Sequence, residues 1–147
     1  MRHYGVESWE KVLQELGIEG WAGCAPRLSF PEFDEKATER PGGREGPRAV
    51  WLDERSYETA WGVRHRFGEG DWYTEWIGGP LQEAQTVEDI YAYPFPTGEN
   101  IVVPEDYEEQ IRDLKEAGRF VSGGIANPYK TAWELRGMNN VLADYLI

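Results

Sequence analysis

Two aromatic-rich runs with a period of two constrain the fold more than any other feature of this sequence. The alternating residues are Trp61, Val63 and His65 in the first run and Trp72, Thr74 and Trp76 in the second. Residues 67 to 71 (FGEGD) separate the runs with a short glycine-containing connector. We therefore predict a β-hairpin within the period-two region of residues 48 to 77. We interpret its tryptophans as cross-strand packing in preference to ligand stacking, because aromatic pairs stabilise exposed hairpins.

Before the hairpin, the sequence predicts one helix and one long loop. Ser8 is a candidate N-cap, and Gly17 stands where a left-handed C-terminal cap belongs. The apolar face between them consists of Trp9, Val12, Leu13 and Leu16. Residues 25 to 47 are rich in proline, glycine and alternating charge, and their portion RPGGREGP excludes a central strand or a stable helix. We predict an exposed loop there.

After the hairpin, helices alternate with a single strand. A capping box at Thr86 predicts a short helix, and residues 104 to 118 predict a longer one with proline in its first turn. Residues 119 to 126 form a short strand that runs into a glycine turn, and two helical segments broken near Gly137 follow. The fold class is therefore α/β, although one βα unit cannot close a barrel. Residues 140 to 147 remain apolar-periodic without a stop signal, from which we expect a chain cut within its fold.

The charge balance excludes two classes of partner. The sequence holds 15 Lys and Arg against 27 Asp and Glu, a net charge of −12. Such a surface repels nucleic-acid phosphates and anionic membranes. Cys24 is the single cysteine, so no intrachain disulfide forms, and no apolar run approaches the length of a bilayer span. We expect a cytoplasmic protein.

A family resemblance extends over nearly the whole chain. The segments that carry it are YGVESW from residue 4 with LGI from residue 16, ETAWGV from residue 58, GPL from residue 79, TVEDIYAYPFP from residue 86, Gly123-Gly124, and AWELRGM from residue 132. In this order and spacing they resemble the amino-terminal part of the uroporphyrinogen decarboxylase (URO-D) superfamily. The likeness is closest to its methyltransferase-like branch. The stretch Ser122-Gly123-Gly124 also carries no aspartate where true decarboxylases place one, which disfavours porphyrinogen decarboxylation.

The resemblance implies a partial (β/α)₈ TIM barrel. Residues 1 to 147 would form the incomplete amino-terminal part of that domain, namely its first βα units and a β-hairpin insertion, without the strand that precedes residue 4 in the family. The parent protein would be a corrinoid-linked methyltransferase-type enzyme that acts on a small-molecule substrate. Corrinoid and zinc would belong to this parent, with the zinc ligands on later barrel strands. In this chain we expect no cofactor and no metal, because His3, His65 and Cys24 lack metal-ligand spacing.

The candidate pocket residues follow the single strand, because barrel active sites lie at the carboxyl ends of strands. Asn127 and Tyr129 would offer hydrogen bonds there, and Arg136 would meet an anionic group. The alternative, purely structural interpretation of the same residues is a turn and a helix-end ion pair. His65 is interpreted as a paired surface residue of the hairpin, and the catalytic residues are unknown.

Two alternatives remain open beside the methyltransferase-type parent. One is a true uroporphyrinogen decarboxylase, a lyase of porphyrin biosynthesis. The other is a non-enzymatic interaction module whose tryptophan hairpin presents an aromatic patch. For a truncated barrel we expect self-association through exposed apolar faces and a poorly cooperative melt.

Overall fold

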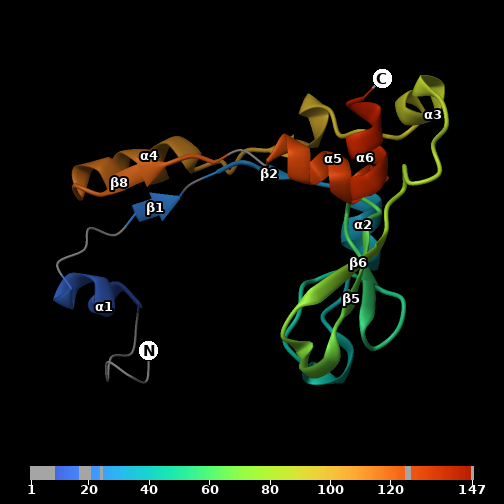
Figure 1. Ribbon diagram of the computed structural model, residues 1–147. Helices are drawn as coiled ribbons and strands as arrows, with labels where there is room; N and C mark the ends of the chain where they lie inside the picture. Colours follow the sequence, from blue (N-terminus) through green and yellow to red (C-terminus); the bar gives the residue numbers. More distant parts are fainter. Residues whose placement is uncertain (1–8, 17–20, 24, 125–126, 147) are drawn as a thin grey trace. The chain divides into compact units, whose positions relative to one another are not determined.

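The computed structural model describes residues 9–16, 21–23, 25–124 and 127–146 in two compact units (Figure 1). Unit 1 comprises residues 1–27 and 101–125, and unit 2 comprises residues 28–100 and 126–147. The chain therefore passes from unit 1 into unit 2, returns to unit 1 at residue 101, and enters unit 2 again at residue 126. The predicted N-cap Ser8 and C-cap Gly17 of the first helix lie outside the described residues.

Unit 1 contains a pair of parallel strands. They are β1 (Trp21–Gly23) and β8 (Phe120–Ser122), with Ala22 opposite Val121 in the register. The unit also contains α1 (Trp9–Glu15), in which Val12 is buried, and α4 (Tyr107–Glu116), which contacts β8. The strand predicted within residues 119 to 126 is thus confirmed, and its partner β1 was not predicted.

The predicted α4 ends as its sequence indicates. Gly118 adopts a φ of +68°, a left-handed conformation that glycine reaches without steric cost. Its backbone N–H donates to the Lys115 carbonyl, and the N–H of Arg119 donates to the Leu114 carbonyl at 2.9 Å. The chain then turns directly into β8. A short strand, β7 (Ile101–Val102), precedes this helix and pairs with β2 (Arg27–Leu28).

Unit 2 is built on an antiparallel sheet of four strands in the order of the chain. They are β3 (Val50–Trp51), β4 (Ser56–Glu58), β5 (Arg64–Phe67) and β6 (Thr74–Gly78). The predicted hairpin is β5 and β6, joined through the short 3₁₀ turn η3 (Glu69–Asp71), with His65 opposite Trp76. The prediction of a hairpin is confirmed, but its strands are shorter than the alternation suggested, because Trp61, Val63 and Trp72 lie outside them.

Aromatic side chains pack in or against two hydrophobic cores of unit 2. One core consists of Ala49, Tyr57 and Phe67 with Trp51 packed against them. The other consists of Val63, Leu81 and Leu135, against which Trp61, Trp76, Ala84, Ile90 and Tyr93 pack. Packing therefore accounts for Trp51, Trp61 and Trp76. Trp72 lies in residues 68 to 73 between β5 and β6, which we call the hairpin connector, and is 89% exposed.

The helices of unit 2 come from segments that precede and follow the four sheet strands in the sequence. They are α2 (Pro31–Lys36), α3 (Val87–Tyr91), α5 (Pro128–Arg136) and α6 (Met138–Asp144), with the 3₁₀ turns η2 (Pro41–Gly43) and η4 (Gly98–Asn100). The capping box of α3 is formed as predicted, with Thr86 and Asp89 exchanging both hydrogen bonds. Gly137, at a φ of +88°, separates α5 from α6 where the break was predicted. The prediction of loop throughout residues 25 to 47 was wrong, because α2 lies within it.

The architecture is mixed α/β. The described residues contain six α-helices, a four-stranded antiparallel sheet and one parallel strand pair, and no closed barrel. None of the helices described is long and apolar enough to cross a membrane.

Candidate functional site

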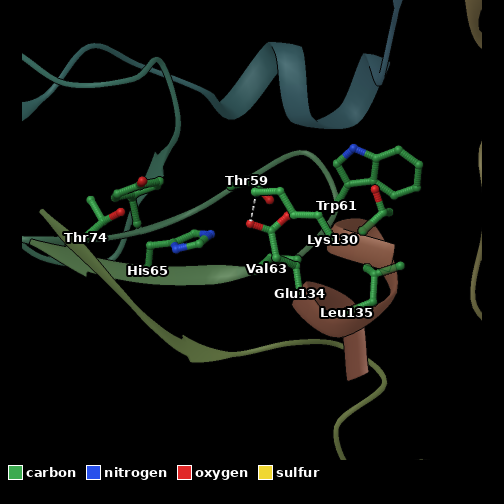
Figure 2. Close-up of a pocket in the computed structure, with 10 residues that line it drawn as sticks. Thr59, Trp61, Val63, His65, Thr74, Lys130, Glu134 and Leu135 are labelled. Atoms are coloured by element: carbon green, nitrogen blue, oxygen red, sulfur yellow. Dashed lines mark hydrogen bonds and ion pairs between the residues drawn. The ribbon is translucent and has the colours of Figure 1, made fainter. Parts of the chain in front are cut away.

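A cavity of about 350 Å³ lies between the sheet and α5, entirely within unit 2. We call it the sheet–helix pocket, and its lining residues are Tyr57, Thr59, Trp61, Val63, His65, Thr74, Lys130, Thr131, Glu134 and Leu135. Figure 2 places His65 of β5 on one side of the pocket and Lys130, Glu134 and Leu135 of α5 on the other. The pocket thus brings together side chains from two separate stretches of sequence.

Hydrogen bonds to two backbone carbonyls of α5 fix this helix against the sheet and the segment after it. The indole Nε1 of Trp76 on β6 donates to the Glu134 carbonyl at 2.8 Å, and the N–H of Leu81 donates to the Leu135 carbonyl at 2.9 Å. These bonds satisfy carbonyls in the last turn of the helix, which has no further turn to supply donors. The opposite end of α5, with Lys130 and Thr131, is thereby set beside the pocket.

Trp61 is held at the pocket by contacts on two sides. Its ring packs edge-on against Phe30 at a centroid distance of 5.5 Å. Its carbonyl accepts a hydrogen bond of 2.9 Å from the hydroxyl of Tyr93, and burial raises the pKa of that phenol. The indole wall of the pocket is therefore pre-positioned, which reduces the ordering cost of binding a ligand.

His65 is half-buried and stacks on Tyr57, with 5.5 Å between the ring centroids. Burial lowers its pKa, Glu134 opposes this effect by raising the pKa, and Lys130 lowers it. With a pKa below the ordinary value of about 6.5, the imidazole is neutral at pH 7. It then presents one donor and one acceptor nitrogen.

Lys130 and Glu134 form an ion pair one turn apart on α5. Their side chains are 59% and 21% exposed, so the ammonium is the more solvated partner. The ammonium also lies 5.9 Å from the centroid of the Trp133 ring. An exposed ion pair of this kind contributes at most about 1 kcal/mol to stability, so a competing ligand can replace it at little cost.

The chemistry available in the pocket is recognition by charge and hydrogen bonding. It offers one cation, one carboxylate, one neutral imidazole and three threonine hydroxyls beside an aromatic and aliphatic wall. No three His, Cys, Asp or Glu side chains of the described chain gather closely enough to hold a metal ion.

The predicted pocket residue Asn127 caps the start of α5. Its side-chain oxygen accepts hydrogen bonds from the backbone N–H groups of Tyr129 and Lys130 at 3.0 and 3.3 Å. The hydroxyl of Tyr129 donates to the sulfur of Met138 at 3.1 Å. Neither residue lines the sheet–helix pocket. Their assignment to a substrate pocket stays a prediction.

Arg136 ties the end of α5 to two neighbours. It pairs with Asp144 of α6 at 3.0 Å and donates to the carbonyls of Leu81 and Ala84 at 3.1 and 2.8 Å. The ion pair raises the pKa of Arg136 and lowers that of Asp144. Arg136 also lines a second, mostly apolar cavity of about 570 Å³ between α5, α6 and α3. The helix-end ion pair, which was the purely structural interpretation of Arg136, is present.

Sequence reasoning did not assign His65, Lys130 or Glu134 to a pocket. His65 was interpreted as a paired surface residue of the hairpin, and it is half-buried, stacks on Tyr57 of the neighbouring strand and lines the pocket. Lys130 and Glu134 carried a usable signal, since their i, i+4 spacing places them on one helix face. Nothing in the sequence indicated that this face would meet β5.

Comparison of the chain with protein-family models, with curated proteins and with solved structures finds no match in any of the three.

Proposed function

We propose that this chain is the amino-terminal part of a uroporphyrinogen decarboxylase superfamily barrel, and that its parent is a corrinoid-linked methyltransferase-type enzyme. The observation that carries the proposal is the parallel pairing of β1 with β8. Parallel neighbours require a crossover connection, and they are the unit from which a (β/α)₈ barrel is assembled. An all-antiparallel chain would have offered no such support.

The order of the elements also supports this proposal. Residues 28 to 100, which include the four-stranded sheet, stand between β1 and the helix α4 that precedes β8. The resemblance expects an insertion containing a β-hairpin at this point of the chain. In the order of the chain, the helix α5 follows β8, which is the succession of a βα unit, and this helix packs on the antiparallel sheet of unit 2.

The proposal assigns this chain a scaffolding share of the enzyme. The resemblance implies that the zinc ligands lie on later barrel strands of the parent. When bound, the corrinoid would supply a transferable methyl group, and zinc would activate the accepting thiol. We assign no catalytic residue to this chain.

Methyl transfer by the complete protein that contains this chain tests the proposal. The purified protein would be mixed with methylcobalamin and a small thiol, and the thioether product measured. We expect product with the complete protein and none with residues 1 to 147 alone. A complete protein that binds neither a corrinoid nor a tetrapyrrole, and that transfers no methyl group, contradicts the proposal.

One observation favours a second candidate, the interaction module. Trp72 and Tyr73 in the hairpin connector are 89% and 57% exposed, and large exposed aromatic side chains mark contact surfaces. This candidate is distinguished by the behaviour of the isolated chain in solution. A monodisperse monomer that melts in one cooperative transition favours it over a truncated barrel.

A further inference from the structure

The sheet–helix pocket carries an inference that does not depend on the barrel. Its volume of about 350 Å³ lies at the small end of the range for small-molecule sites. Residues from three strands and one helix of unit 2 line it, so the ligand would contact elements that the core already holds in place. The question is which ligand chemistry its lining fits.

The formal charge of the lining is zero at pH 7. Lys130 contributes one positive charge, Glu134 contributes one negative charge, and burial lowers the pKa of His65 so that it is neutral. A ligand with a net charge would pair with one of these groups and repel the other. A ligand that carries both charges satisfies both of them, because its carboxylate accepts from Lys130 and its ammonium donates to Glu134.

The separation of the two charges limits the ligand further. Lys130 and Glu134 are in direct contact across one turn of α5, so the opposite charges of the ligand must also be close together. An α-amino acid meets this condition, since a single carbon joins its ammonium to its carboxylate. The hydroxyls of Thr59 and Thr74 add hydrogen-bonding groups on the sheet side.

The rest of the lining favours an apolar side chain on that ligand. Trp61 is half-buried and lines the pocket, whereas Val63 and Leu135 behind it are 3% and 4% exposed and already covered by the core. An aliphatic side chain that covers the exposed part of the Trp61 indole is removed from water, at about 25 cal/mol for each Å² buried. A polar side chain would gain nothing from this ring.

We propose that the sheet–helix pocket binds a free α-amino acid with an apolar side chain, its carboxylate at Lys130 and its ammonium at Glu134.

Calorimetric titration of the 147-residue chain tests this assignment with three matched probes. L-leucine carries both charges, L-leucinamide lacks the carboxylate, and 4-methylpentanoate lacks the ammonium. We expect L-leucine to bind with a dissociation constant on the order of 1 mM or below, and each analogue to bind about tenfold more weakly or not at all. No heat of binding with L-leucine, or equal binding of either analogue, overturns the proposal.

Variants locate the binding site. Lys130→Gln and Glu134→Gln should each weaken L-leucine binding about tenfold, whereas Lys115→Gln and Glu116→Gln on the exposed α4 of unit 1 should leave it unchanged. Urea unfolding of each variant checks that the fold is kept. Unchanged binding by both pocket variants places the ligand elsewhere and overturns the assignment. Methyl transfer is not measured here, so this result is independent of the proposed enzyme.

Discussion

Arg40 links the segment before the sheet to the hairpin connector. Its side chain is 1% exposed, donates to Asp71 at 2.9 Å and to the Glu45 carbonyl at 3.1 Å, and lies with its guanidinium carbon 3.9 Å from the centroid of the Phe67 ring. Asp71 has a φ of +59°, a conformation that residues other than glycine rarely adopt. The contact with Arg40 holds it there.

We expect Arg40→Ala to lower the free energy of unfolding by about 2–3 kcal/mol, because hydrogen bonds and a cation–π contact are lost together. Arg44→Ala is the matched control, because Arg44 approaches the same carboxylate at only 3.7 Å and is 57% exposed. The Arg44→Ala substitution should lower the free energy of unfolding by less than about 0.5 kcal/mol. Urea unfolding followed by tryptophan fluorescence compares the two. An equal loss of unfolding free energy in the two variants would mean that Arg40 does not anchor the hairpin connector.

The stability of unit 2 should fall as the pH is lowered from 7.5 to 5.5. Burial lowers the pKa of His65 in the folded state, so the unfolded state takes up a proton first as the pH falls below about 6.5. The stability that neutral His65 contributes is complete above the pKa of His65 in the unfolded chain. It is lost as the pH falls through the lower pKa of His65 in the folded chain. Asp53, Asp71, Asp89 and Asp144 also have lowered pKa values, but they titrate below this window.

His65→Gln isolates this effect. Its unfolding free energy should change less between pH 7.5 and 5.5 than that of the parent chain, because the variant has no imidazole to protonate at this position. Urea unfolding at several pH values measures the slope. If the parent and the variant show the same slope, His65 is not the group responsible.

At the scale of elements, Gly79, just after β6, lies against the end of α5. A Cβ at Gly79 would stand 2.2 Å from the Leu135 carbonyl oxygen and 2.3 Å from that of Glu134. These are backbone atoms, and hydrogen bonds to Trp76 and Leu81 hold them in place. Only glycine therefore fits between the strand and the helix.

Gly79→Ala should lower the free energy of unfolding by about 1–3 kcal/mol, since α5 must shift to admit the methyl group. Gly98→Ala is the control, because a Cβ at that position meets nothing within 4 Å. The shift of α5 should also reduce L-leucine binding in the Gly79 variant. Equal stability of the two variants in urea would show that α5 does not pack as described.

Local signals predicted the elements that depend on neighbouring residues. The capping box at Thr86, the end of α4 at Gly118 and the break at Gly137 each use a side chain or a positive φ within one turn. The overlooked α2 had a signal too, since Pro31 at its first turn and the acidic Glu32 and Asp34 favour a helix start. The glycine-rich and proline-rich residues after it obscured that signal.

Elements that depend on partners far away in the sequence could not be predicted from local sequence patterns. β1 has three residues and forms a strand through pairing with β8, near the other end of the chain. The sheet–helix pocket likewise arises because α5, late in the sequence, docks on strands from its middle. Hydrophobic periodicity and capping residues indicate local conformation. Neither specifies which face of a helix will contact which strand.

At the scale of the whole molecule, the chain divides into two units with different chemistry. Unit 1 contains the parallel pair on which the barrel proposal depends, and unit 2 contains the charged pocket on which the amino-acid proposal depends. The two proposals can therefore fail separately. Loss of L-leucine binding would leave the barrel proposal standing, and absence of methyl transfer would leave the pocket assignment standing.

A structure of the complete protein that contains this chain tests the central claim most directly. We predict that β1 and β8 are adjacent parallel strands of a closed (β/α)₈ barrel, with Ala22 beside Val121 as in this register. Residues 28 to 100 should then form an insertion after the first of these strands. An open sheet, or β1 and β8 in separate sheets, would contradict the claim.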